Sequence, residues 1–297
     1  MYKLLYTENI GFNMSDWENM QIREVFAGTD CIMAITDDGQ VLQKTICTSV
    51  AARTKYWTRI KEIALSKWAS GLAIGLVSDG TCMISKCAVR KYDEEMNFDI
   101  INSEIKSWTD IVQVAASDAF FGLDKAGNVH YAPLYKFGVV DYFGVTEWKN
   151  VKKIVTGNQN SIFAVTAEGK VLSEGSNCRQ GPHGDISHYL SSIEGVVDIS
   201  PTGSECENVL MLLRDGRIID LYGETVDTLT LPATVSDKVL DSTAFYFVLA
   251  NEGKRLINLC NNSHEIMNLD NGRIVSFAAG DINYKDEFAI AVAELND

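Results

Sequence analysis

The hydrophobic positions of this chain recur in six copies of one pattern, in which an apolar run, a glycine-containing turn and a second short apolar run follow one another. The copies begin at Cys31, Leu72, Ala119, Ser161, Asn208 and Phe245, and their ninth residue is always glycine: Gly39, Gly80, Gly127, Gly169, Gly216 and Gly253. In three copies the glycine follows aspartate, and Asp-Gly favours tight hairpin turns because it readily adopts positive φ. The pattern therefore predicts one β-hairpin in each copy.

A second apolar element precedes each hairpin, with two apolar residues three positions apart and a small residue three positions later. Its copies begin at Ile22, Ile60, Ile111, Val151, Val196 and Ile274, and a degraded copy lies around Val239 to Ser242. Successive turn glycines are 41, 47, 42, 47 and 37 residues apart, a period typical of one four-stranded propeller blade. Together the two elements predict seven such units.

The last unit is incomplete, because the apolar strand from Phe288 runs to Asp297 without a glycine turn. Near the other end, the segment from Lys3 to Asn9 resembles the strand that follows the turn of the fourth unit. A ring of blades has only short, protected edges when its first and last blades are joined. We therefore expect residues 1–10 to complete the seventh blade.

Composition favours an all-β fold in one domain. Hydrophobic residues make up 46% of the chain, prolines number only 4, and no long capped helix pattern is found. No linker rich in Gly, Pro or Ser divides the repeats, so we expect a single seven-bladed β-propeller over residues 1–297. The predicted blades are approximately 15–56, 57–107, 108–147, 148–192, 193–234 and 235–271, with 272–297 and 1–14 forming the last.

Three features recur together in the repeats: a tryptophan followed three residues later by an apolar residue, a small residue ending the next strand, and the glycine turn. The tryptophans are Trp17, Trp57, Trp108 and Trp148. In these features essentially the whole chain resembles the repeats of the regulator of chromosome condensation family. The resemblance implies a seven-bladed propeller and offers two precedents for protein binding, which are nucleotide exchange on a small GTPase and inhibition of a β-lactamase.

Two departures from the family pattern bear on function. The family often has histidine shortly after the small residue, where this chain has residues such as Cys31, Phe120 or Asn160. This chain also has no basic tail and no clear counterpart of the wing-like insertion found in the chromatin-bound member of the family. We therefore do not expect a chromatin role. A WD-type propeller has a similar period, but its Gly-His and Trp-Asp signatures are absent.

The chain carries 26 basic and 40 acidic side chains, which gives a formal net charge of −14. A strong negative field repels phosphate backbones and attracts basic partners, so we expect no direct nucleic-acid binding and a partner with basic groups. An acidic surface can alternatively serve only solubility. The sequence has no leader-like segment and no apolar stretch of membrane-spanning length, and its seven cysteines are irregularly spaced. We therefore expect a cytoplasmic monomer that does not contact membranes.

Residues with active-site chemistry are scattered rather than grouped. None of the four histidines, His130, His183, His188 and His264, lies in an H-E-x-x-H pattern, and no phosphate-binding loop or dinucleotide fingerprint is present. The loop from Asp281 to Glu287 has Lys285 in place of an alternating oxygen ligand and lacks the central glycine of an EF-hand. We therefore expect no catalytic residue, no metal and no cofactor, and the chain is not predicted to be an enzyme.

The loops between the first and second strands of the blades are expected to gather at one mouth of the propeller. Their aromatic and acidic side chains are typical of a protein-binding surface that selects a partly basic partner. The candidate partner-binding residues are Asp30, Trp68, Asp118, Phe120, Asn160, Glu205, Glu207, Tyr246, Tyr284 and Asp286. Phe120 and Tyr246 can alternatively be inward core residues, whereas Trp68 and Tyr284 lie further from the apolar runs. The four recurrent tryptophans are expected to be wedges between adjacent blades.

The leading interpretation is a non-enzymatic protein-interaction module that binds its partner through this ring of loops. Guanine-nucleotide exchange or enzyme inhibition on a protein partner are the more specific alternatives that the resemblance implies. A lyase or hydrolase with its site in the channel mouth is the alternative from another class. It would need convergent titratable groups there, and the sequence positions no such set.

Overall fold

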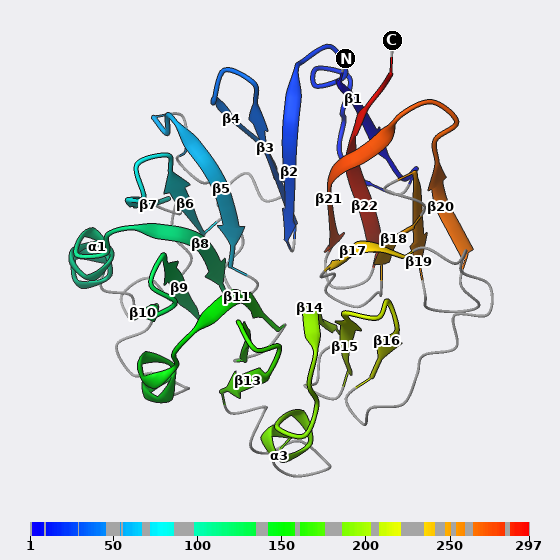
Figure 1. Ribbon diagram of the computed structural model, residues 1–297. Coiled ribbons are helices and arrows are strands. Elements are labelled where there is room, and N and C mark those ends of the chain that lie inside the picture. Colours follow the sequence, from blue (N-terminus) through cyan, green and yellow to red (C-terminus); the bar gives the residue numbers. More distant parts are fainter. Residues whose placement is uncertain are drawn as a thin grey trace.

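The computed structural model is a β-propeller, the fold predicted from the repeat (Figure 1). It describes residues 2–8, 10–28, 30–45, 54, 56–66, 72–85, 98–134, 142–157, 161–175, 186–202, 208–220, 235–240, 247–250, 254–258, 264–282 and 286–296. Within these residues the strands form seven small antiparallel sheets arranged around a centre. The first strand of each sheet lies nearest that centre, and the later strands lie further out.

Consecutive strands form each of the first six sheets. The first three contain β2 (Ile22–Gly28), β3 (Cys31–Thr36) and β4 (Val41–Thr45); β5 (Ile60–Leu65), β6 (Ala73–Val77) and β7 (Cys82–Ile84); and β8 (Ile111–Ala116), β9 (Ala119–Asp124) and β10 (Val129–Pro133). The next three contain β11 (Val151–Thr156), β12 (Ile162–Thr166) and β13 (Val171–Glu174); β14 (Val196–Thr202), β15 (Asn208–Leu213) and β16 (Ile218–Ile219); and β17 (Val235–Leu240), β18 (Phe247–Ala250), β19 (Arg255–Asn258) and β20 (His264–Asn268).

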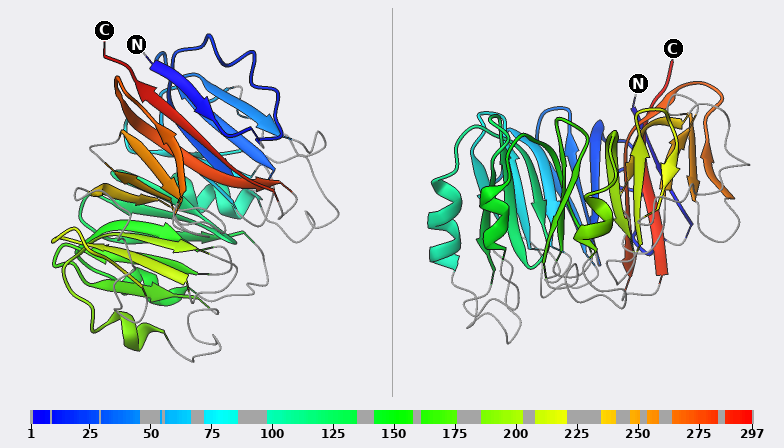
Figure 2. Two further views of the ribbon diagram at one scale, coloured as in Figure 1. Left: turned by 90° about the vertical axis from the view of Figure 1, so that its right-hand side faces the viewer. Right: turned by 60° about the horizontal axis from the view of Figure 1, so that its bottom comes forward.

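The seventh sheet combines strands from both ends of the chain. It contains β21 (Arg273–Ile282), β22 (Asp286–Glu294) and β1 (Tyr2–Tyr6). β1 pairs antiparallel with β22, with Tyr2 opposite Glu294 and Tyr6 opposite Ile290. The N- and C-terminal ends consequently lie side by side in Figure 1 and in both views of Figure 2.

The apolar core lies between neighbouring sheets rather than in one central mass. Trp17, Trp57 and Trp108 are buried in clusters that each join two adjacent sheets, and Trp148 packs against another such cluster. The prediction that the recurrent tryptophans are wedges is therefore confirmed. The Trp108 ring lies directly over Gly122, where an added Cβ would come within 2.9 Å of the ring.

Three of the hairpin glycines also contact the strand that opens the next sheet. Three backbone hydrogen bonds of this kind run from Ile111 N to Gly80 O at 3.0 Å, from Val151 N to Gly127 O at 3.2 Å, and from Val196 N to Gly169 O at 3.0 Å. We call this contact the clasp. Gly127 has φ +82°, and a Cβ there would lie 3.0 Å from the backbone nitrogen of Val151. Glycine is required at this position both for its conformation and for the close approach of the next sheet.

The helices in the described part of the chain lie at the outer edge of the sheets (Figure 2). They are α1 (Phe98–Lys106), the 3₁₀ helix η2 (Phe143–Glu147) and α3 (Ser187–Leu190). α1 buries Ile101 and Ile105 in the cluster between the second and third sheets, and α3 buries Leu190 between the fourth and fifth. Over the described ranges, none of the helices has the length and apolar character needed to cross a membrane.

Candidate functional site

The first strand of six sheets carries a β-bulge near its start. In five of these strands the first and third residues, and in β21 the second and fourth, pair with two adjacent residues of the second strand, so the residue between them is extra. We call the six extra residues the bulge ring: Arg23, Lys61, Val112, Lys152, Val197 and Val275. A bulge places its extra residue outside the ladder and re-aims the neighbouring side chains. Because the clasp holds the hairpins against the starts of these strands, the bulge ring lies at the hairpin side of the propeller.

The residue after the bulge reaches the first strand of the next sheet. Three such residues accept a hydrogen bond from a backbone N–H there, in the pairs Gln113 and Ile154, Ser276 and Val25, and Glu62 and Val114. Gln113 also donates its Nε2 to the Ile154 carbonyl oxygen, and both of its bonds measure 2.9 Å. We call this contact the bridge. An amide, a hydroxyl and a carboxyl perform the same bridging role at three junctions.

At the junction between the fourth and fifth sheets, the residue after the bulge is a hydrogen-bond donor instead of an acceptor. Lys153 occupies the position after the bulge, and lysine cannot accept a hydrogen bond. It forms an ion pair with Asp198, which holds the same position in the next sheet and has a side chain only 5% exposed. Asp198 Oδ1 accepts the N–H of Ile199 at 2.8 Å, so the backbone donor is satisfied from its own strand.

Glu62 is the bridging residue with the most altered acidity. Burial raises its pKa to about 8 from an ordinary 4.5, the hydrogen bond from Val114 opposes this rise, and the charge of Glu24 adds to it. A carboxyl of this kind near a channel can act as a general acid or base. In this protein the Glu62 carboxyl is engaged with the backbone of the next sheet, which gives it a structural role.

A hollow of about 490 Å³ opens beside the bulge ring, across the third, fourth and fifth sheets. Val112, Lys152 and Val197 of the bulge ring line it, together with Lys153 and with Arg214 from the hairpin after β15. The hollow therefore combines cationic and aliphatic side chains at the hairpin side of the propeller.

Phe120, Asp118 and Asp30 are the predicted partner-binding residues whose side chains the structure describes. Phe120 is 0% exposed in the core between the second and third sheets, so its assignment to the surface is corrected to the alternative of an inward core residue. Asp118 is buried and accepts a hydrogen bond from the Tyr142 hydroxyl at 2.5 Å. Burial raises the pKa of Asp118 despite that bond. Asp30 is also buried and has a positive φ of 57°.

The other seven predicted partner-binding residues have no described side chain. Trp68, Asn160, Glu205, Glu207, Tyr246 and Tyr284 lie outside the described residues. Asp286 is described by its backbone alone, as the first residue of β22. A role of these residues in partner binding stays a prediction.

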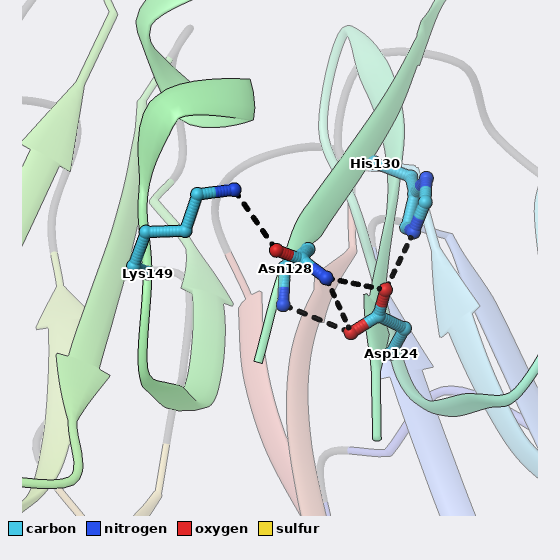
Figure 3. A network of polar contacts seen from close by, with 4 residues as sticks. All are labelled: Asp124, Asn128, His130 and Lys149. Atoms are coloured by element: carbon cyan, nitrogen blue, oxygen red, sulfur yellow. Dashed lines mark hydrogen bonds and ion pairs between the residues drawn. The ribbon is translucent and has the colours of Figure 1, made fainter. Parts of the chain in front are cut away.

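His130, one of the four histidines, belongs to a polar network that holds a hairpin (Figure 3). Asp124 accepts hydrogen bonds from the backbone and side chain of Asn128 and contacts His130 Nε2 at 3.1 Å. Lys149, which precedes the next sheet, donates to Asn128 Oδ1 at 3.0 Å. Burial opposes the ionisation of Asp124, but its bonds to Asn128 and His130 outweigh burial and lower its pKa. The network ties the third hairpin to the entry of the fourth sheet.

Comparison with known proteins finds similar structures but no similar sequences. No protein-family model matches the chain, and no match is found among curated proteins. Human WBSCR16 matches with a TM-score of 0.63 and 13% identity over 94% of this chain and 88% of that chain. A chain of the crystal structure of Kap60 bound to yeast RCC1 (Prp20) matches with a TM-score of 0.59 and 13% identity over 96% and 82%. PorZ of Porphyromonas gingivalis matches at 0.51 and 12% identity, over 94% of this chain and 38% of that chain. These similarities establish the propeller fold.

Proposed function

We propose that this protein is a non-enzymatic protein-interaction module of the regulator of chromosome condensation type. The proposal rests on one observation: polar residues of the inner strands form contacts with the neighbouring sheet. Gln113, Glu62 and Ser276 satisfy backbone groups of the next sheet, and Lys153 pairs with Asp198. These contacts join neighbouring sheets, which supports a role of the inner strands as a scaffold.

This use of polar groups bears directly on the alternative of a lyase or hydrolase. Such an enzyme needs an acid and a base within reach of the same substrate atoms. Glu62, an inner-strand carboxyl whose pKa is raised to about 8, accepts a hydrogen bond from Val114. Moving its carboxyl to a substrate would leave that buried N–H unpaired, which costs roughly 1–3 kcal/mol. Binding at the surface requires no such rearrangement.

The scaffold itself is suited to presenting surface loops. Clasps and bridges fix several neighbouring sheets against one another, so the strands that carry the loops at either mouth have well-defined positions. We place the partner on the predicted ring of loops that includes Trp68 and Tyr284, with basic groups on the partner facing the chain's net charge of −14. Yeast RCC1 bound to Kap60 is a precedent for a propeller of similar fold in a protein complex. Nucleotide exchange and enzyme inhibition are special cases of such binding.

The proposal is tested by capturing partners from source-cell lysate on the immobilised protein and measuring the affinity of the captured protein in purified form. Substituting both Trp68→Ala and Tyr284→Ala is expected to weaken binding at least about tenfold, since aromatic residues dominate binding hot spots. Tyr56→Ala, which removes a 73% exposed aromatic outside the ring, is the matched control and leaves binding unchanged. Unaltered affinity in the double variant would refute the predicted ring, and turnover of a small molecule by residues in the channel would refute the proposal as a whole.

A further inference from the structure

The hollow on the hairpin side differs in charge from the rest of the molecule. Three of its ten lining residues are cationic and none is acidic, whereas the whole chain has 40 acidic and 26 basic side chains. Lys153 is held by Asp198, which leaves Lys152 and Arg214 as the exposed cations of the hollow. In the described part of the chain neither of these two side chains forms an ion pair or a hydrogen bond. A local cationic site thus stands within a strongly acidic protein.

The nearest carboxylates do not neutralise both cations. Glu168 lies on the hairpin beside the hollow, where its backbone and Thr166 hydrogen bonds and, to a smaller extent, the charges of Lys170 and Lys152 lower its pKa. Asp215, which follows Arg214 in the next hairpin, is paired with Arg217 at 2.8 Å. Arg214 therefore remains available to a carboxylate from outside the molecule.

The walls of the hollow are aliphatic. Val165 and Val196 are buried, and Val112 is partly exposed. Val197 is 43% exposed because the bulge in β14 places it outside the ladder. An exposed valine next to two cations fits a ligand that has both an apolar side chain and negative charge. The volume of about 490 Å³ accommodates a few side chains.

We propose that this hollow is a second binding site, which takes an acidic segment of a partner protein with an aliphatic side chain flanked by aspartate or glutamate. The aliphatic side chain packs on Val112 and Val197, and the flanking carboxylates pair with Lys152 and Arg214. A nucleic acid also carries negative charge, but its extended phosphate backbone would meet the field of a chain with net charge −14. A short acidic segment presents its charge only at the hollow, which favours the protein ligand.

The site is tested by selecting binders from a random-sequence peptide library displayed on phage against the full-length protein. The matched variants are Lys152→Glu with Arg214→Glu, which reverses the charge of the hollow, and Lys170→Glu with Arg217→Glu, which makes the same charge change on the same two sheets outside it. Synthetic versions of the selected peptides are titrated into the wild-type protein and both variants at two salt concentrations. A single-stranded oligonucleotide of mixed sequence is titrated alongside them.

The proposal expects selected peptides enriched in aspartate and glutamate around a leucine, isoleucine or valine. Their affinity falls about tenfold or more in the hollow variant, is unchanged in the control variant and weakens as salt is raised. Selection of basic peptides, failure to enrich any peptide, equal affinity for both variants, or tighter binding of the oligonucleotide would each overturn it. The site is separate from the predicted ring of loops, so its failure would leave binding through Trp68 and Tyr284 untouched.

Discussion

The clasp and the bridge both join neighbouring sheets but place opposite demands on the sequence. The clasp is made by backbone atoms alone, and it has the same form at Gly80, Gly127 and Gly169. The bridge is made by a side chain, and it uses an amide at Gln113 but a hydroxyl at Ser276. A backbone contact at close range permits only glycine, whereas a bridge needs only an acceptor of suitable reach. The clasp therefore appears in the sequence as a recurring glycine. The bridge position, in contrast, accepts different residue types.

The largest loss of stability is expected in the seventh sheet, where the two ends of the chain meet. There β1 pairs with β22 through backbone hydrogen bonds within one sheet, and not through a clasp between sheets. Deleting residues 1–10 removes β1, its pairing with β22 and the buried side chain of Ile10. We expect the free energy of unfolding to fall by roughly 5 kcal/mol or more, measured by chemical denaturation. Lys3→Ala changes an exposed residue of the same strand and should have little effect. An unaltered stability after the deletion would mean that β1 does not contribute to the ring.

Gly169 and Gly216 allow the two requirements of the clasp, positive φ and the close approach of the next sheet, to be measured separately. Gly169 and Gly216 have φ values of +82° and +86°, but only at Gly169 would a Cβ lie 3.0 Å from the backbone of the next sheet, at Gly195. Around Gly216 no atom of the described residues lies within 4 Å of an added Cβ. Gly216→Ala should cost about 1–2 kcal/mol through backbone strain, and Gly169→Ala about 1 kcal/mol or more beyond that. Equal losses in thermal or chemical unfolding would show that the clasp adds nothing to the turn.

A single bridge is expected to contribute less. Gln113→Ala leaves both the N–H and the carbonyl of Ile154 without a side-chain partner, and the expected loss of unfolding free energy is about 1–3 kcal/mol. Gln113→Glu can still accept the N–H but cannot donate, so its stability should lie between those of the wild type and the alanine variant. If the glutamate variant were as unstable as the alanine variant, the accepted hydrogen bond would not be the stabilising part.

The Glu62 bridge makes stability depend on pH. Its pKa is about 8 in the folded protein and 4.5 ordinarily, so the folded state binds the extra proton between these values. The free energy of unfolding should therefore fall as pH rises through this window. The slope corresponds to a difference of at most one bound proton between the folded and unfolded states. In Glu62→Gln that contribution is absent, and stability measured from pH 6 to pH 8 should be flatter. Glu168→Gln, a change at a carboxyl with a lowered pKa, leaves the slope in this range unchanged.

The fold was largely predictable because the clasp leaves a visible signature. The glycine turns and the wedge tryptophans predicted hairpins and contacts between sheets, and both are present, for example at Gly127 and Trp108. The bridges were not predicted, because a glutamine, a serine and a glutamate at equivalent positions do not form a recognisable pattern in the sequence. Their common signal is positional: each stands two residues after the apolar residue that begins the repeated element of the inner strand.

The candidate site was less predictable than the fold. Phe120 was a reasonable surface candidate because it follows a loop, yet β9 packs against neighbouring sheets on both faces, so the Phe120 ring lies in the core. The hollow was missed because its cations come from separate sheets, Lys152 from a bulge and Arg214 from a hairpin. A register shift of one residue decides whether a side chain faces the core or the solvent, and the apolar pattern alone does not reveal it.

The central claim is that polar groups on the inner strands join sheets while binding takes place at the surface. It is tested most directly by measuring the affinity of a partner captured by the wild-type protein for Gln113→Ala, at a temperature where this variant is folded, together with its free energy of unfolding. The account predicts a loss of stability with an affinity within about twofold of the wild type. A variant with wild-type stability that had lost binding about tenfold or more would contradict it, because Gln113 would then belong to a site in the channel.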